Sequence, residues 1–364
     1  MTEKFTAVSL FTGAGGMDIG FQKAGFNIVW ANELMPHAAA TYDLNHREGV
    51  MHRGDINDVF NELPKPGTID CVIGGPPCQG FSVAGKMDLD DERSKLVFSY
   101  MDVVEYLKPS VFVMENVKAL ASLAKFSAIR DELMRRAQVA GYCASLYLLN
   151  AKDFGVPQSR ERVFFVGFRK SMGIVFNAAY FEKYKKDPLS VREILTHFGP
   201  AGTEKNPLTC KAKITLAENP VMRKSPYAGM LFNGLGRPIN TDGVSCTLPA
   251  SMGGNKTPII DEAHVFEGKE NWVENYHSSL RNGGLPLGMN DAPSSLRRIT
   301  VKEAAAIQTF PLDYKFSGPI SSQYTQIGNA VPSDLAKAVA FSVSDALSGV
   351  VVPKGEKQGE IEFS

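Results

Sequence analysis

The stretch TAVSLFTGAGGMDIGFQKA, residues 6–24, decides the fold class of this chain. An apolar run over 6–11 predicts a strand, and the pattern over 18–24 predicts a helix. Between them lies a turn that begins at Phe11 and contains Gly13, Gly15 and Gly16. Glycines at such a turn let the backbone bend tightly and approach a bound molecule closely. Strand, glycine-rich turn and helix in this order predict the first unit of an α/β domain.

The same alternation of apolar runs and helical patterns continues to about residue 170. Strands are predicted over 27–31, 68–73, 111–117, 144–149 and 162–168, and helices over 95–107 and 127–140. Alternation at this spacing implies parallel pairing, with helices on both faces of the sheet. Ligands bind at the carboxyl ends of such strands. We therefore expect a Rossmann-like catalytic and cofactor-binding domain over 1–170.

The amino-acid composition of the chain and its periodicity change after residue 170. Pro, Gly, Asn and Lys become frequent, as in HFGPAGTEKNP, and regular periodicity fades. We expect a second, smaller, loop-rich domain over 171–295. Helical patterns at 300–308 and 333–347 predict that residues 296–350 return to the first domain. The polar end, 351–364, is expected to be disordered.

Composition restricts the class of protein. Lys and Arg together number 39, as do Asp and Glu, but residues 151–300 carry 20 basic against 14 acidic side chains. A basic region on a neutral chain fits a polyanionic partner, although random surface variation explains the charge equally well. Five cysteines without a CxxC pair argue against a disulfide framework and a zinc site. We expect no metal, no membrane segment and a cytoplasmic, nucleoid-associated protein.

Two acidic positions extend the glycine-rich turn into a pocket prediction. Glu33 ends the strand VWANE about 20 residues after the turn, where a carboxylate can accept hydrogen bonds from ribose hydroxyls. Asp55 could accept from an adenine amino group, and Ile56 could pack against the ring. Alone, the turn fits nucleotides, flavins and S-adenosylmethionine alike, and a strand-end acid is often a helix cap. Together these residues predict an adenosine-shaped pocket.

Cys78 is the candidate nucleophile. It lies in GGPPCQGFS, residues 74–82, directly after the apolar strand IDCVI. Two glycines and two prolines constrain this loop, and reactive cysteines lie on such loops, whereas Cys71 lies inside the strand as a structural cysteine would. A thiol with an ordinary pKa near ~8.5 needs electropositive surroundings to react as a thiolate.

With these residues in view, the sequence resembles the cytosine-C5 DNA methyltransferase family of bacterial restriction-modification systems. Nine consecutive residues match the family's Pro-Cys-Gln loop, and the other motifs follow in the family's order. The resemblance implies a Rossmann-like S-adenosylmethionine-dependent methyltransferase with a target-recognition domain. It also implies double-stranded DNA as substrate, a cognate endonuclease as partner, and DNA (cytosine-5-)-methyltransferase activity. We expect a monomer.

The resemblance assigns roles to further residues. Glu115, in MENV, would contact ring nitrogen N3 and the exocyclic amine of the target cytosine. Arg162 would reach the cytosine O2, and Arg160 would orient the site and help hold the thiolate; both lie in QSRER, residues 158–162. Asn329, in QIGNAVP, would close the cofactor pocket together with Pro77. Where family members often carry an aromatic residue after the ribose-binding Glu, this chain has Leu34, so no adenine stack is expected there.

The recognition residues are predicted from side-chain chemistry and from the Thr247-Leu248 pair, which resembles an element of the family's recognition domains. Arg, Asn, Lys and Thr suit phosphates and base edges. An ordinary polar surface loop remains an alternative for this stretch. The predicted DNA contacts are Gln79, Ser82, Arg237, Thr247, Asn255 and Lys256.

Three other functions compete with this interpretation. An RNA-modifying enzyme of the same fold would keep Cys78 and the cofactor pocket, but the sizeable recognition region favours DNA. A DNA-binding protein with an inactive site conflicts with the complete set of Cys78, Glu115, Arg160 and Arg162. A dinucleotide oxidoreductase needs a GxGxxG turn, and this turn is FxGxGG.

Overall fold

The computed structural model describes residues 5–77 and 92–352, and the chain folds into two compact units. The first, which we call the sheet unit, comprises residues 1–154, 161–186 and 331–364. The second unit comprises residues 155–160 and 187–330. The chain therefore leaves the sheet unit twice, once for a six-residue segment and once for a long one.

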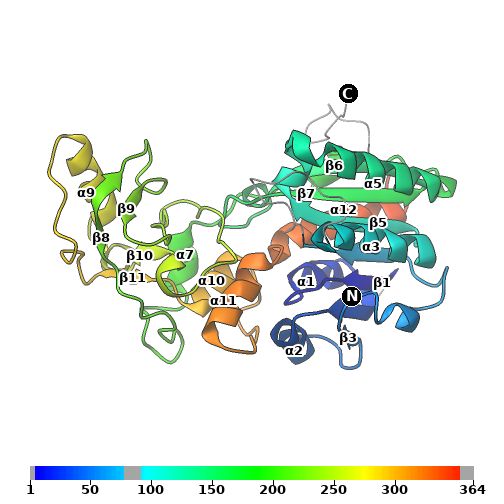
Figure 1. Cartoon of the computed structure of the whole chain (residues 1–364), viewed down its shortest axis with the longest axis horizontal. Helices are drawn as coiled ribbons and strands as arrows, with labels where there is room; N and C mark the ends of the chain where they lie inside the picture. Colours follow the sequence, from blue (N-terminus) through cyan, green and yellow to red (C-terminus); the bar gives the residue numbers. More distant parts are fainter. Residues whose placement is uncertain (1–4, 78–91, 353–364) are drawn as a thin grey trace. The chain divides into compact units, whose positions relative to one another are not determined.

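A seven-stranded sheet organises the sheet unit (Figure 1). Its strands are β1 (Phe5–Leu10), β2 (Phe26–Glu33), β3 (Met51–Arg53), β4 (Cys71–Gly74), β5 (Val111–Val117), β6 (Tyr142–Asn150) and β7 (Glu161–Arg169). Their order across the sheet is β3-β2-β1-β4-β5-β7-β6. The strands β1 to β5 pair in parallel, so the carboxyl ends of these strands share one edge.

The strand β7 departs from the expected parallel arrangement, and that part of the prediction was wrong. It runs antiparallel to both β5 and β6. The segment between β6 and β7, residues 151–160, contains only the short 3-10 turn Ala151–Asp153. A parallel connection needs a crossover of a dozen or more residues, usually a helix. Reversal brings the start of β7 to the edge where β1, β2, β4 and β5 end.

Helices cover both faces of this sheet. They are α1 (Gly16–Lys23), α2 (Pro36–Asn45), α3 (Glu92–Leu107), α4 (Lys118–Ser122), α5 (Ser127–Val139), α6 (Ala179–Glu182) and α12 (Ser333–Leu347). On one face α3 and α5 bury an apolar core with Val8, Val72 and Phe112 of the strands. On the other face α6 packs through Phe181 on Tyr147 of β6, and α12 packs on α6 and α1 (Figure 1).

The second unit is built from short elements and polar contacts. They are β8 (Leu216–Val221), β9 (Met230–Phe232), β10 (Ile259–Asp261), β11 (Leu296–Arg298), α7 (Val191–Thr196), α8 (Glu262–Glu267), α9 (Trp272–Arg281), α10 (Val301–Ile307) and α11 (Ile320–Asn329). The strands form two antiparallel ribbons, β8-β9 and β10-β11. Both contribute to a small apolar core that includes Leu216, Ile259 and Leu296.

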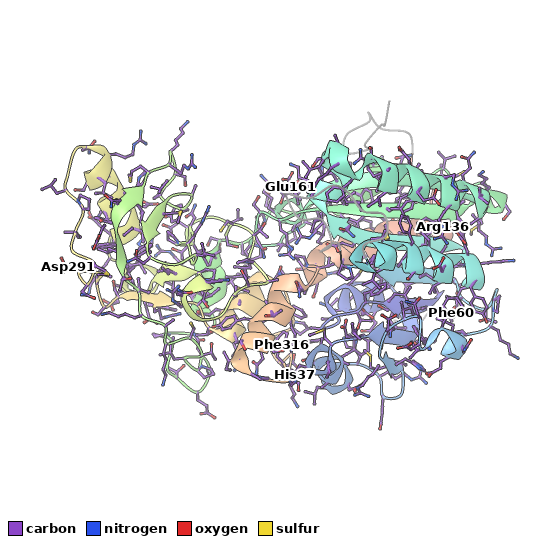
Figure 2. The ribbon with its side chains drawn as sticks, viewed as in Figure 1. His37, Phe60, Arg136, Glu161, Asp291 and Phe316 are labelled. Carbon is purple, nitrogen blue, oxygen red and sulfur yellow. The ribbon has the colours of Figure 1, made fainter. Side chains whose placement is uncertain are left out.

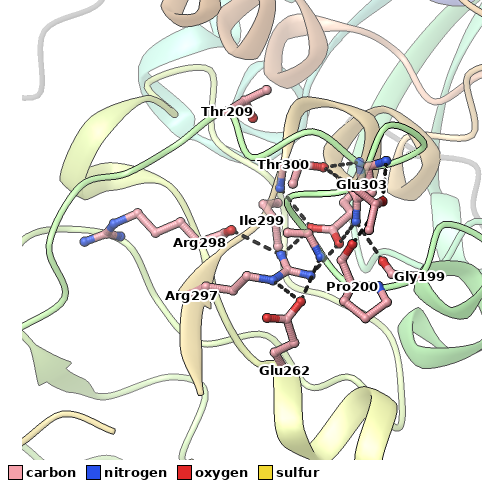
Figure 3. A network of polar contacts seen from close by, with 12 residues as sticks. Gly199, Pro200, Thr209, Glu262, Arg297, Arg298, Ile299, Thr300 and Glu303 are labelled. Carbon is pink, nitrogen blue, oxygen red and sulfur yellow. Dashed lines mark hydrogen bonds and ion pairs between the residues drawn. The ribbon is translucent and has the colours of Figure 1, made fainter. Parts of the chain in front are cut away.

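A buried ion pair connects the elements of the second unit (Figure 3). The guanidinium of Arg297 donates to both carboxylate oxygens of Glu303 at 2.8 Å, and Glu303 is fully buried. Glu303 also accepts from the main-chain nitrogen of Thr300 and from the side chain of Asn206. Thr300 caps the start of α10, because its hydroxyl in turn accepts from the main chain of Glu303.

Most elements of the sheet unit agree with the sequence prediction. The strand over 111–117 and the helix over 333–347 are confirmed to the residue. In the second unit, the predicted helix over 300–308 corresponds to α10 with its two flanking cap residues, Thr300 and Gln308. None of the helices in the described part of the chain is long and apolar enough to cross a membrane.

Candidate active site

The glycine-rich turn and Glu33 meet at the carboxyl edge of the sheet. The main-chain nitrogen of Gly13 donates to Glu33 Oε2 at 2.7 Å, and that of Met35 donates to Oε1 at 2.7 Å. Burial raises the pKa of Glu33, and amide hydrogen bonds from Met35, Gly13 and Leu34 oppose that rise. A Cβ placed on Gly13, whose φ is 55°, would meet no protein atom within 4 Å. The turn therefore leaves open space beside a fixed carboxylate, which suits a ligand that carries hydroxyl donors.

The segment around Asp55 is fastened to the same edge. Asn32 donates its side-chain amide to the carbonyls of His52 and Gly54, and the nitrogen of Gly54 donates to the carbonyl of Glu33. Asp55 accepts from the main chain of Asn57 and is accessible at the surface, while Ile56 is buried in the core. Asp55 and Ile56, the two predicted pocket residues, thus come directly after Gly54, whose main chain is bonded to Glu33. The residue at the position of the missing aromatic side chain, Leu34, is 56% exposed.

The segment that leads into the Cys78 loop is tightly packed against Glu115. A Cβ on Gly74 would lie 2.5 Å from the carbonyl oxygen of Leu10, so β4 can end there only with a glycine. A Cβ on Gly75 would lie 3.1 Å from Glu115 Oε2. Next in the chain, Pro76 is buried and its carbonyl accepts from the side chain of Asn116 at 3.0 Å. The carboxylate of Glu115 consequently lies close to Gly75, three residues before position 78.

Arg162 completes this cluster because β7 is reversed. Its Cα pairs with that of Val117, and alternation along the strand places its side chain on the same face as that of Glu115. Arg162 Nε lies 2.9 Å from Glu115 Oε1, and both side chains are nearly buried. A guanidinium on the carboxylate fixes its orientation. Glu161, the first residue of β7 (Figure 2), forms a separate, exposed ion pair with Lys118.

The described arrangement, a buried Glu–Arg pair near the segment that precedes position 78 and a glycine-rich turn bonded to a buried carboxylate, agrees with the comparison to known proteins. Residues 5–345 match the family described as C-5 cytosine-specific DNA methylase. The chain belongs to this family. Its activity is accordingly that of a DNA cytosine-5 methyltransferase.

Relatives of this methyltransferase span nearly its whole length. The Type II methyltransferase M.FnuDI of Fusobacterium nucleatum is 34% identical over 94% of this chain and 94% of its own. M.MthTI of Methanothermobacter thermautotrophicus is 34% identical, covering 94% of this chain and 98% of its own. Among solved structures, the Dnmt2 methyltransferase of S. pombe matches with a TM-score of 0.65 at 18% identity, covering 95% and 99% of the two chains. That likeness shows a shared fold.

Three sequence motifs of the methyltransferase meet inside the second unit. Gln158 donates to Gln308 at 2.9 Å and accepts from the main-chain nitrogen of Leu248. Arg160 is 1% exposed and donates to the carbonyls of Leu248 and Gly328. A Cβ on Gly328 would lie 2.5 Å from the carbonyl of Pro249. The QSRER, Thr-Leu and QIGNA motifs therefore form one buried joint, and the expected role of Arg160 at the thiolate stays a prediction.

The other predicted contacts of the second unit lie at its surface. Thr247 is exposed and donates its hydroxyl to the carbonyl of Ser159. Arg237, Asn255 and Lys256 are exposed, as is Asn329 at the end of α11. These positions are accessible to a large ligand, and their assignment to DNA or cofactor stays a prediction.

Three predicted residues, Cys78, Gln79 and Ser82, lie outside the described residues. Pro77, at the end of the described segment, is exposed. Across residues 5–77 and 92–352, no three His, Cys, Asp or Glu side chains gather as a metal site would require. Burial raises the pKa of the Cys71 thiol, as expected for a structural cysteine inside β4.

Two residues that position the site were missed from the sequence. Asn116 donates to the carbonyl of Pro76 and so holds that residue in place. Its neighbour Glu115 was identified only by resemblance to the family. The signal for Asn116 in the sequence is an amide at a strand end, next to a functional carboxylate. Gln308 donates to the carbonyl of Ile327 and accepts from Gln158. A single glutamine after AAAI in α10 carries no signal of this role, because the bonds join residues distant in sequence.

Proposed function

We propose that this methyltransferase transfers a methyl group from S-adenosylmethionine to carbon 5 of cytosine in a specific duplex DNA sequence, with Cys78 as covalent nucleophile. The observation that carries the proposal is the closeness of Glu115 Oε2 to Gly75, three residues before Cys78, with Arg162 on the other carboxylate oxygen. A positioned carboxyl group beside a constrained cysteine is what addition to a pyrimidine ring requires.

The residues at the edge of β1 and β2 fit S-adenosylmethionine. Glu33 would accept from the ribose hydroxyls, and the open space above Gly13 leaves room for the backbone to approach the ligand. Asp55 and Ile56 would border the adenine, and Phe11, Gly15, Gly16, Pro77 and Asn329 complete the proposed pocket. When bound, S-adenosylmethionine supplies an electrophilic methyl group from its sulfonium.

C5 of cytosine is a weak nucleophile, and the residues of this chain would activate it. The sulfur of Cys78 forms a bond to C6, and the electron pair of the C5–C6 double bond moves into the ring. Glu115 places a proton on N3, which holds that pair as an enamine, and Arg162 holds the O2 side of the ring. After C5 has taken the methyl group, it releases its proton to a water molecule. The sulfur then leaves C6, the double bond returns, and Glu115 recovers the proton from N3.

None of these steps can take place in a stacked base pair. The target base must therefore leave the helix, at a cost of a few kcal/mol, as it does in DNA methyltransferases generally. We assign the second unit, residues 155–160 and 187–330, to target recognition. We extend to this chain a cognate endonuclease as partner, because its relatives are named Type II methyltransferases.

Methyl transfer tests the substrate. Labelled S-adenosylmethionine is incubated with the wild-type enzyme and either duplex DNA or tRNA, and bisulfite sequencing then locates the modified cytosines. We expect label in duplex DNA at cytosines within one sequence context. Label in tRNA alone would refute the proposed substrate. Plasmids from expressing cells should resist endonucleases that cut the same sequence in its unmethylated form. Such resistance would support the proposed endonuclease partner.

Substitution tests the nucleophile. Cys78→Ser is expected to abolish methyl transfer while S-adenosylmethionine still binds, and DNA with 5-fluorocytosine at the target should trap the wild type covalently, because fluorine at C5 cannot leave as a proton does. Cys143→Ser is the matched control, since Cys143 is an exposed thiol on β6. Normal turnover by the Cys78 variant would show that another group attacks the base.

A further inference from the structure

The β8-β9 ribbon contains a bulge in β8 with two polar side chains that do not stabilise the described part of the fold. Leu216 pairs with Phe232 and Val221 pairs with Met230, so residues 217–220 on β8 face only one residue of β9. Leu216, Leu231 and Phe232 anchor the ribbon in the apolar core of the second unit. A bulge on an anchored ribbon re-aims its side chains without loosening the strands. The sequence Ala217-Glu218-Asn219-Pro220 is thereby pushed out of the pairing.

A groove of about 380 Å³ runs along this bulge. Its polar lining comes from Glu218, Asn219 and Asn233, all of which are exposed. The amide of Asn233 is held by Thr215 and the carbonyl of Leu216. Within the described residues, the side chains of Glu218 and Asn219 make no hydrogen bond or ion pair with another part of the chain. An exposed carboxylate and an exposed amide that the fold does not use are available to a ligand.

Predicted DNA contacts lie beside the groove. A Cβ on Gly234, which lines the groove, would be 2.8 Å from the carbonyl oxygen of Asn255, and the nitrogen of Gly236 donates to that same oxygen. Lys256 follows Asn255 and is exposed. This end of the groove therefore has a cation next to it.

Further cations lie on the connection between the two strands. Arg223 and Lys224 follow β8 and are exposed, and Arg237 donates to the carbonyl of Ala228 in the same connection. Exposed cations thus occur on segments of the chain that adjoin the groove, and groups of this charge match the phosphates of a nucleic acid.

The chemistry of the groove selects the part of DNA that it would meet. A two-stranded ribbon fits the major groove, where an asparagine can bond adenine N6 and N7 and a carboxylate can accept from the amino group of cytosine. Glu218 would be repelled by phosphates, so only a base amino group gives it a favourable partner there. We propose that Glu218 and Asn219 read base pairs next to the target cytosine through the major groove. This inference rests on the proposed function, because it assumes duplex DNA as the substrate.

The test uses the full-length enzyme and duplexes randomised on both sides of the target cytosine. Bisulfite sequencing gives the methylation preference at each flanking position for wild type, Glu218→Ala, Glu218→Gln and Asn219→Ala. Each alanine variant is expected to lose discrimination by about tenfold or more at one flanking position while still methylating cytosine. Glu218→Gln should change the preferred base at the position that Glu218→Ala relaxes. Glu204→Ala, an exposed acid of the second unit outside the groove, is the matched control and should keep the wild-type profile.

The outcomes separate this inference from the proposed function. If the wild type methylates no DNA, the proposed function fails. If the wild type methylates one context and all variants share its profile, only the reading role of the groove is refuted. Equal loss of activity on every sequence by a variant that melts like the wild type also refutes it, because discrimination would then not depend on these side chains.

Discussion

The two units of the molecule each contain an arginine–glutamate pair with nearly the same N···O separation, in different surroundings. The Glu115–Arg162 pair of the sheet unit and the Glu303–Arg297 pair of the second unit have separations of 2.9 and 2.8 Å. Around Glu303, both oxygens are satisfied by the arginine, by Asn206 and by the main chain at the start of α10. Glu115 lies instead against Gly75, at the approach to Cys78. The N···O separation alone therefore does not distinguish a structural pair from a functional one. The groups that surround each carboxylate make the distinction.

Other buried acids of the molecule are held by neutral hydrogen-bond donors. Glu33 and Asp18 are both buried, and their described partners are neutral donors: main-chain amides for Glu33, and Ser9 and Tyr42 for Asp18. A buried carboxylate without a cation is costly for the fold. Asp261 of the second unit is likewise buried and accepts from the main-chain nitrogens of His264 and Trp272, so both units bury an acid among neutral donors.

Glu115→Gln should have the largest effect on catalysis. The amide keeps the shape of the side chain but cannot deliver a proton to N3, so we expect the rate of methyl transfer to fall at least about a hundredfold. Single-turnover kinetics on the folded protein measures this; thermal unfolding should also shift to a lower temperature, because the nearly buried Arg162 loses its carboxylate partner. Glu132→Gln, which removes an exposed pair with Arg135, is the control. A variant that keeps its rate but loses stability would make Glu115 a structural residue like Glu303.

Glu303→Gln should lower stability but leave the rate of methyl transfer unchanged. It leaves the guanidinium of Arg297 buried with one carboxylate fewer, and we expect a loss of roughly 3 kcal/mol in the free energy of unfolding. Urea unfolding measures the loss, while the fraction that remains folded should transfer methyl groups normally. Glu267→Gln breaks an exposed pair with Lys269 and should leave unfolding unchanged. Unchanged stability of the Glu303 variant would contradict the structural role.

Glu33→Ala should weaken cofactor binding without affecting DNA binding. Loss of a carboxylate that accepts from ribose hydroxyls is expected to raise the Kd for S-adenosylmethionine about tenfold or more. Equilibrium dialysis measures the Kd for S-adenosylmethionine, and an electrophoretic mobility shift assay measures the affinity for DNA. Glu48→Ala, at an exposed turn after α2, should change neither. An unaltered cofactor affinity would remove Glu33 from the pocket.

The smallest effect is expected at Asp18, through pH. Burial raises the pKa of Asp18 to about 6 from its ordinary 3.8, and hydrogen bonds from Ser9 and Tyr42 oppose that rise. The folded protein therefore keeps a proton that the unfolded chain has lost, so stability from this group is present at low pH and disappears as pH rises from about 4 to about 6. Asp18→Asn has no such proton. Its urea stability relative to the wild type should increase across that interval, and a constant difference would show that Asp18 does not titrate there.

Sequence periodicity predicted the sheet unit well because its strands and helices have regular apolar faces. The strand over 111–117 and the helix over 333–347 show this, and their burial follows the pattern of the sequence. The direction of β7 was predicted wrongly as parallel, since the apolar pattern of a strand is the same in either orientation. That direction mattered, because it is what brings Arg162 to Glu115.

The candidate site could be predicted in part. Gly13 and Glu33 were paired from their spacing, and the structure joins them by a hydrogen bond. The contact of Glu115 with Gly75 needed coordinates, because 40 residues separate these positions. In the second unit, the bonds of Gln158 and Arg160 to distant carbonyls leave no periodic signal at all.

The joint between Gln158, Arg160 and the Leu248 and Gly328 carbonyls limits how the enzyme can be re-engineered. Residues 155–160 precede β7 in the chain but belong to the second unit. A chimera that imports residues 187–330 from a relative would leave the host's own glutamine and arginine facing foreign carbonyls. Exchange of sequence preference between family members should therefore carry two segments, with the six-residue insert transplanted alongside the long one.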